Sequence, residues 1–119
     1  MTTNTITVEV HLDDKKVPNQ ITWKASATSA EQAQKSKAMI MAFWDALDKS
    51  AMRIDLWTKD MMVDEMADFY YQVFVTMGDS FLRATNNQIL VNDIKEFASG
   101  FHKKFQEMER EKQNQQQPK

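Results

Sequence analysis

The chain has 119 residues, a common size for one domain, and a formal net charge of −2 without a block of basic residues. This charge balance argues against sequence-independent nucleic-acid binding, which needs a clustered positive face. The chain has no cysteine, which excludes disulfides and thiolate metal sites, and its longest apolar run, Ala38 to Trp44, is far shorter than a membrane span.

The first half of the chain alternates apolar and polar residues, the period of half-buried strands. Ile6–Leu12 is the first predicted strand, and Asp13–Lys16 is a polar turn. Pro18 cannot donate to a strand ladder, so it belongs at the turn end of a second strand that covers Ile21–Ala25. The short connection predicts an antiparallel hairpin.

A polar segment and a second pair of strands follow. Residues 26–37 bury little and predict a loop, with room for one helical turn at Ala30–Gln34. The segment contains no glycine, so it is not a phosphate-binding loop. Ala38–Trp44 predicts a third strand that is apolar on both faces, and Ala51–Trp57 predicts a fourth, with the loop between them at residues 46–49.

The parity of this last loop decides which faces of the third and fourth strands match, because a slip of one residue inverts a strand. An odd loop pairs the Met52 face with Ile40 and Trp44. An even loop is favoured because it collects six large apolar side chains into one core layer: Met39, Met41, Phe43, Met52, Ile54 and Leu56. Either pairing leaves a second apolar surface on the third strand.

After Asp60 the apolar period becomes that of a helix. The first helix is predicted to start within Asp60–Val63 and to run to about Thr85, with Gly78 inside it as a sign of close packing. Asn86-Asn87 breaks this helix and caps a second one that fades near Lys112. Residues 113–119 are rich in glutamine and are predicted to be a disordered tail.

The order of these elements is ββββαα. It predicts an α+β fold in which a four-stranded antiparallel meander sheet is followed by two C-terminal helices packed on one of its faces. Residues 1–112 are expected to form a single domain, and the short connection between the helices predicts that they are antiparallel.

The polar residues show no pattern typical of catalysis or metal binding. His11 and His102 are far apart and lack the spacing of metal ligands. Asp64, Glu65 and Asp68 lie on the polar side of the first helix, as solvated carboxylates do. We therefore assign no catalytic, cofactor or metal residues and expect a protein that is not an enzyme.

Arg53, Asp55 and Trp57 share the outer face of the fourth strand, at intervals of about 7 Å. One interpretation is a cross-strand ion pair beside a partly exposed tryptophan. The other is a recognition patch, since Trp and Arg are frequent among binding hot spots. Ile40 and Trp44 extend the patch on the third strand. We expect a partner or a second copy to cover this face, which makes the protein a partner-binding module or a homodimer.

The segment Arg53–Met61, followed by Val63–Met66, resembles the signature of the gliding motility-associated GldC family of Bacteroidota. The resemblance covers nearly the whole chain. Met62 stands where the family pattern has proline, a change that leaves the resemblance intact because proline at a helix start only preorganises it. Further matching pieces, in order, are Lys16-Val17-Pro18, Ile21-Thr22-Trp23, Lys37-Ala38 and Trp44-Asp45.

The resemblance implies a small soluble accessory protein of the gliding machinery, whose partner is an unidentified motility or envelope protein. Together with the absence of a secretory signal pattern at the N-terminus, it leads us to expect a cytoplasmic location. An alternative function follows from the many methionine and aromatic residues: a small-ligand-binding protein with an apolar pocket between helices and sheet.

Overall fold

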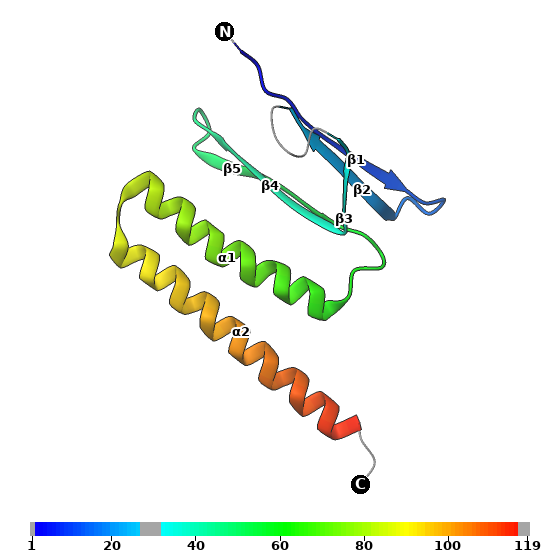
Figure 1. Ribbon diagram of the computed structural model, residues 1–119, viewed down its shortest axis with the longest axis vertical. Coiled ribbons are helices and arrows are strands. Elements are labelled where there is room, and N and C mark those ends of the chain that lie inside the picture. Colours follow the sequence, from blue (N-terminus) through cyan, green and yellow to red (C-terminus); the bar gives the residue numbers. More distant parts are fainter. Residues whose placement is uncertain (1, 27–31, 117–119) are drawn as a thin grey trace. The chain divides into compact units, whose positions relative to one another are not determined.

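A computed structural model describes residues 2–26 and 32–116 (Figure 1). The chain divides into two compact units, Met1–Met61 with all the strands and Met62–Lys119 with both helices. The predicted α+β class is therefore confirmed. A single domain over residues 1–112 and helices packed on one face of the sheet remain predictions.

The first unit contains a three-stranded antiparallel sheet with β2 in the middle. β1 spans Ile6–Leu12, β2 spans Pro18–Ala25 and β3 spans Gln34–Ser36. Ile21 of β2 is paired with a residue of β1 on one side and a residue of β3 on the other, and it is only 1% exposed. The first predicted hairpin is confirmed, and its centre carries the largest fully buried side chain among the described residues of this unit.

The prediction of one four-stranded meander is wrong, because the strands form two sheets. The predicted loop contains β3, and a single bent residue, Lys37, separates β3 from the next strand. Strand pairing changes at this bend, from β2 before it to β5 after it. Of the helical turn predicted at residues 30–34, residues 32–34 are not helical and the first two lie outside the described residues.

The second sheet is an antiparallel hairpin of β4, Ala38–Asp45, and β5, Ser50–Trp57. Its register confirms the even loop: Met39 lies opposite Leu56, Met41 opposite Ile54, and Phe43 opposite Met52. In the connecting turn, Oδ1 of Asp45 accepts hydrogen bonds from the backbone N–H groups of Leu47 and Asp48, at 2.9 and 3.1 Å. The carboxylate thereby satisfies backbone donors that no strand partner reaches.

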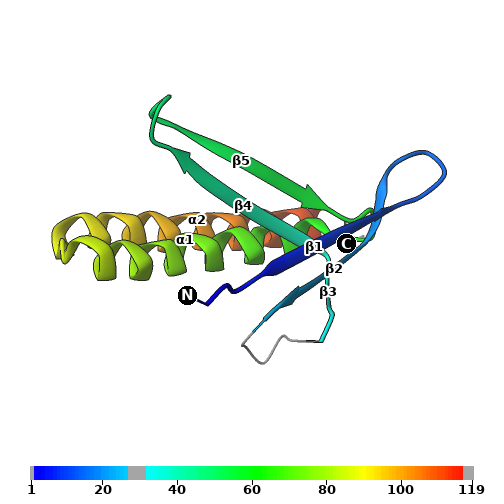
Figure 2. The ribbon, with the colours of Figure 1, turned by 90° about the horizontal axis from the view of Figure 1, so that it is seen from above.

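The second unit is a pair of antiparallel helices, α1 at Val63–Thr85 and α2 at Gln88–Gln116 (Figures 1 and 2). Asn86 ends α1 in the left-handed conformation, and Oδ1 of Asn87 accepts the Leu90 N–H at 3.1 Å, so the predicted break and cap are confirmed. α2 ends later than the predicted Lys112, and residues 117–119 of the predicted tail lie outside the described residues. Within the described chain, neither helix is long and apolar enough to cross a membrane.

Aromatic rings of α1 and α2 contact each other. The ring centroid of Phe74 lies 5.4 Å from those of both Phe97 and Phe101, in edge-to-face geometry. Such pairs add to the hydrophobic burial that holds two helices together. Val91 and Ala98 of α2 are fully buried. Apolar residues of both helices thus meet at this contact, whereas Met77 of α1 and Met108 of α2 are more than half exposed.

Gly78 lies inside α1 and is buried against α2. A methyl group at this position would sit 3.5 Å from Cγ2 of Ile94 and 3.5 Å from Lys95, which is ordinary van der Waals distance. We therefore expect Gly78→Ala to raise the free energy of unfolding by about 1 kcal/mol, because alanine favours the helix. Urea unfolding followed by far-UV circular dichroism measures this gain.

Gly100→Ala is the matched control for Gly78→Ala. Among the described residues, no atom lies within 4 Å of a methyl group placed at Gly100, so helix propensity alone is expected to change there, again by about 1 kcal/mol. Stabilisation by Gly100→Ala together with destabilisation by Gly78→Ala would show that the helices need glycine at their contact.

Candidate functional site

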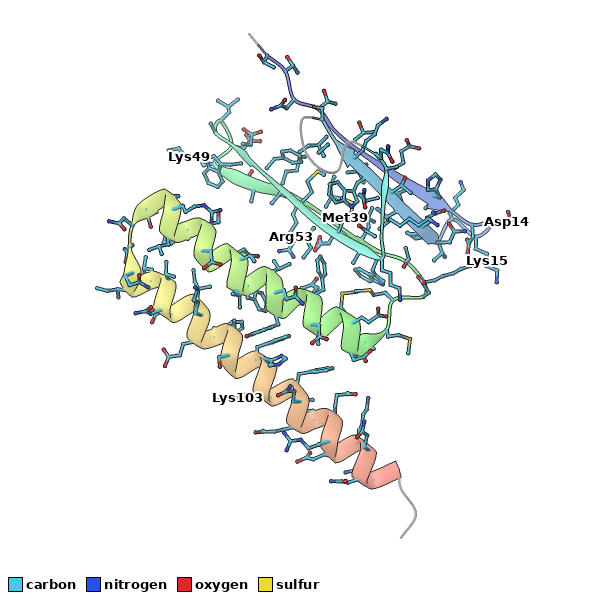
Figure 3. All side chains as sticks on the ribbon, in the orientation of Figure 1. Asp14, Lys15, Met39, Lys49, Arg53 and Lys103 are labelled. Atoms are coloured by element: carbon cyan, nitrogen blue, oxygen red, sulfur yellow. The ribbon has the colours of Figure 1, made fainter. Side chains whose placement is uncertain are left out.

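The five residues of the predicted recognition patch lie on one face of the β4–β5 hairpin. In an antiparallel pair, residues directly opposite each other point to the same side, and Ile40 lies opposite Asp55. We call this surface the Trp57 face; its residues are Ile40, Trp44, Arg53, Asp55 and Trp57. Figure 3 labels Arg53 on this face and Met39 on the opposite one.

An ion pair lies in the centre of the Trp57 face. Nε of Arg53 is 2.9 Å from Oδ2 of Asp55, the residue two positions further along the same strand. The predicted cross-strand pair is therefore wrong, because the register places uncharged Ala42 opposite Arg53. Both side chains keep solvent contact, so the pair contributes little to stability and leaves both charges available to a partner.

Two tryptophans leave a large apolar surface on the Trp57 face. Trp57 is 53% exposed and Trp44 is 69% exposed. Phe43 and Met52, on the opposite face of the hairpin, are exposed as well. A two-stranded hairpin is marginally stable without a covering layer. Both faces of the hairpin thus expose large apolar side chains, and exposed apolar surface of this kind is typical of interaction sites.

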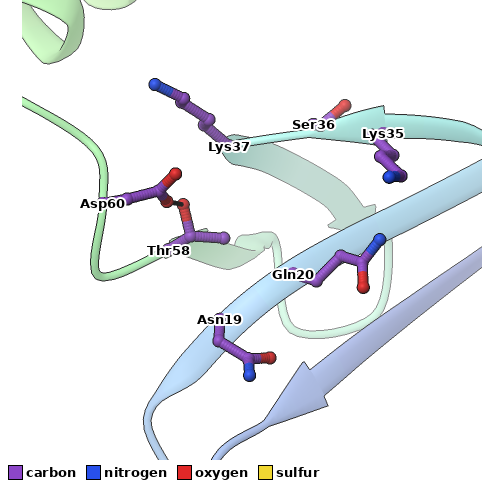
Figure 4. Close-up of a pocket in the computed structure, with 7 residues that line it drawn as sticks. All are labelled: Asn19, Gln20, Lys35, Ser36, Lys37, Thr58 and Asp60. Carbon is purple, nitrogen blue, oxygen red and sulfur yellow. Dashed lines mark hydrogen bonds between the residues drawn. The ribbon is translucent and has the colours of Figure 1, made fainter.

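The segment after β5 joins the two sheets of the first unit. The Thr58 N–H donates to the Lys37 carbonyl at 2.7 Å, and the Lys59 N–H donates to the Pro18 carbonyl at 3.0 Å. Thr58 is 2% exposed, and its hydroxyl donates to Oδ1 of Asp60 (Figure 4). We call Thr58–Asp60 the junction segment, since it contacts the starts of both β2 and β4.

A salt bridge links the junction segment to the first hairpin turn. Nζ of Lys59 lies 3.0 Å from Oδ2 of Asp13. The other oxygen of Asp13 accepts the backbone N–H groups of Lys15 and Val17, at 2.9 and 3.0 Å. One carboxylate thus fixes a turn and holds a segment 46 residues away. Sequence reasoning missed this contact, because no local pattern relates the two segments.

The carboxyl groups of Asp13 and Asp60 both have a pKa below the ordinary aspartate value. For Asp13 the causes are the Val17 N–H and then the Lys59 ammonium; for Asp60 the first cause is the Thr58 hydroxyl. A lowered pKa in the folded state means that the ionised form stabilises folding. This stabilisation is present above the ordinary aspartate pKa of about 4, and it is lost as the pH falls from there through the lowered pKa values.

A cavity of about 440 Å³, lined by polar and charged residues, includes two residues of the junction segment in its wall (Figure 4). Its walls combine amide, hydroxyl, ammonium and carboxylate groups of both signs. Such a lining can hydrogen-bond a polar group, and its Thr58 hydroxyl is already engaged with the Asp60 carboxylate. The lining residues are Asn19, Gln20, Lys35, Ser36, Lys37, Thr58 and Asp60.

A second cavity, of about 370 Å³, lies in the helical unit, where Asp64 and Asp68 of α1 face Glu109 and Arg110 of α2. His102 also lines it, and its ring stacks on Tyr71 with centroids 4.3 Å apart. Two of the three carboxylates noted in the sequence thus share a cavity with a histidine. The described residues nevertheless contain no group of three or more histidine and acidic side chains placed to hold a metal ion.

Each cavity lies within one unit. Neither one therefore tests the apolar pocket expected between helices and sheet, and the ligand-binding alternative stays a prediction. The other histidine, His11, lies with Nε2 3.5 Å from the Thr22 hydroxyl across the first hairpin, and it lines neither of the two cavities.

Comparison with protein families gives one match. The family model described as "Gliding motility-associated protein GldC-like" matches residues 18–107, which include all strands except β1 and most of both helices. The match covers the junction segment and the whole Trp57 face. Comparisons with curated proteins and with solved structures give no significant match.

Proposed function

Because the chain belongs to the gliding motility-associated GldC-like family, we propose that it is a non-enzymatic, cytoplasmic accessory protein of the gliding machinery. In this proposal it acts as an interaction module that binds another motility or envelope protein. The observation that supports it most is the Trp57 face, where two exposed tryptophans flank an ion pair.

The composition of the Trp57 face is that of a binding surface. Tryptophan and arginine are over-represented among residues whose truncation costs most binding energy. Trp57 offers a large ring, and Arg53 offers donors that a partner carboxylate can engage beside it. Asp55 balances the charge and sets the orientation of the guanidinium through the 2.9 Å contact.

Polar residues of the types that act in catalysis in other proteins make structural contacts in this chain. Asp60 accepts the Thr58 hydroxyl, and Asp13 fixes a turn and holds Lys59. His102 stacks on Tyr71 within the helix pair. These contacts support a structural role for the buried and paired polar residues, and they leave binding as the function of the exposed ones.

The test is complementation of a source-organism strain from which the gene is deleted. We expect the wild-type chain to restore colony spreading and the Arg53→Ala/Trp57→Ala variant to fail, since it removes the two hot-spot candidates together. Leu47→Ala is the matched control: Leu47 lies in the turn of the same hairpin, is 92% exposed and is outside the Trp57 face, so this variant should restore spreading.

Affinity capture with the same three chains identifies which part of the proposal fails. Loss of one partner protein with Arg53→Ala/Trp57→Ala, but not with Leu47→Ala, supports the Trp57 face. Identical partners from equally folded chains contradict the role of this face. Normal spreading of the deletion strain contradicts an accessory role in gliding.

A further inference from the structure

β4 has a free edge. It pairs only with β5 in the described part of the chain, so one row of its backbone N–H and C=O groups has no strand neighbour. Natural edge strands are protected from pairing with other chains by charges, proline or bulges. Ala38–Trp44 carries none of these, and its pairing with β5 is regular throughout. β5, in contrast, carries Arg53 and Asp55.

We propose that β4 pairs with β4 of a second copy of this chain, antiparallel and around a two-fold axis that passes through Met41. The product is a continuous four-stranded sheet in which the two β4 strands are central and the two β5 strands are outside. The inference concerns self-association and holds whether or not a motility protein binds the Trp57 face.

Symmetry restricts the register of this pairing. A two-fold axis between antiparallel edges is perpendicular to the sheet, so it keeps each face on its own side. The numbers of two residues that lie opposite each other must then add up to an even number. The residue at the centre of the pairing lies opposite the same residue of the second copy. Registers centred on Met41 and on Ala42 both use nearly all of β4.

Charge and size favour the register centred on Met41. This register places Lys37, immediately before β4, opposite Asp45 of the second copy at both ends of the pairing. It also places the small Ala38 opposite the large Trp44, on the same face. The register centred on Ala42 instead places the Asp45 carboxylate opposite Met39. Opposite charges and a small residue facing a large one are both favourable across a strand pair.

The pairing of two β4 strands gives each hairpin additional strand neighbours, which a two-stranded sheet lacks. Two-stranded sheets are marginal in water, and three or more strands are needed for independent stability. The doubled sheet also brings the Trp57 faces of both copies to the same side, with Trp44 of one copy beside Ala38 of the other. A second copy therefore extends the apolar surface of this face into a continuous one.

Single-cysteine crosslinking tests the register, because the chain has no cysteine of its own. Directly opposed residues of an antiparallel pair lie within the Cα separation that a disulfide requires. We expect Met41→Cys to form a covalent dimer under mild oxidation with diamide, roughly ten-fold faster than Met39→Cys or Phe43→Cys alone. In those two controls each cysteine lies roughly 13 Å along the strand from its own copy.

An equimolar mixture of Met39→Cys and Phe43→Cys should crosslink efficiently, since the proposed register places these two positions opposite each other. Ile54→Cys is the control for the other edge, because Ile54 lies opposite Met41 within the same hairpin. Faster crosslinking at Ile54 overturns the choice of β4, and fastest crosslinking at Ala42 overturns the register.

Light scattering and tryptophan fluorescence complete the test. The wild-type chain should be a dimer at the concentration used, and each reduced variant should show the wild-type fluorescence spectrum, which checks its folding. A wild-type chain that stays monomeric over the whole concentration range, or folded Met41→Cys that crosslinks no faster than Met39→Cys, overturns the proposal.

Discussion

Replacing Phe74 with alanine is expected to lower the free energy of unfolding of the helical unit by about 3 kcal/mol. The Phe74 ring makes edge-to-face contacts with three other rings: Tyr70 on its own helix, and Phe97 and Phe101 on α2. A pair of helices has few other contacts to replace them, so the loss falls on the interface that holds α1 against α2. The loss combines the transfer of the ring to water with the cavity it leaves.

Urea unfolding followed by far-UV circular dichroism measures this change, since both helices lie in the second unit. Met77→Ala is the control: Met77 lies on the same helix and is 55% exposed, so we expect a loss below about 1 kcal/mol. Equal losses from the two variants would show that the Phe74 ring contacts do not hold the helix pair together.

Ile21→Ala is expected to destabilise the first unit by about 3 kcal/mol. Ile21 is 1% exposed and occupies the centre of the middle strand, between Val10 of β1 and Ser36 of β3. Among the described residues of this unit no larger side chain is equally buried, so its truncation leaves a cavity that the three-stranded sheet cannot easily close.

Tryptophan fluorescence measures this loss selectively, because Trp23, Trp44 and Trp57 all belong to the first unit. Ile6→Ala is the matched control in the same sheet; Ile6 is 70% exposed, and its truncation should cost less than about 1 kcal/mol. An unchanged fluorescence transition for Ile21→Ala would contradict the place of this side chain in the core.

Hairpins, helices and the Trp57 face were predictable because each rests on local periodicity. Alternation over Ile6–Leu12 and Ala51–Trp57 indicates strands, and an even loop alone brings Met41 opposite Ile54. The same parity places all five patch residues on one face. Asn86-Asn87 marks the helix break because asparagine tolerates the left-handed conformation and caps the next helix.

The division into two sheets was not predictable, because its cause has no sequence signal. β3 is three polar residues long, too short to show alternation, and the bend at Lys37 contains neither glycine nor proline. The direction of the Arg53 ion pair was predicted wrongly for a related reason. Only the register shows that its cross-strand neighbour is Ala42 and that Asp55 on the same strand is the nearer carboxylate.

The junction segment has a consequence for the order in which the first unit folds. Each hairpin closes a short loop, whereas the contacts of Lys59 with Asp13 and Pro18 join segments more than 40 residues apart. Closing such a loop costs more chain entropy, so these contacts are expected to form after the folding transition state. Interactions that form late slow unfolding without speeding folding. The contacts of the junction segment are thus expected to affect how slowly the first unit unfolds more than how fast it folds, and the exposed Lys59–Asp13 salt bridge is a small part of that effect.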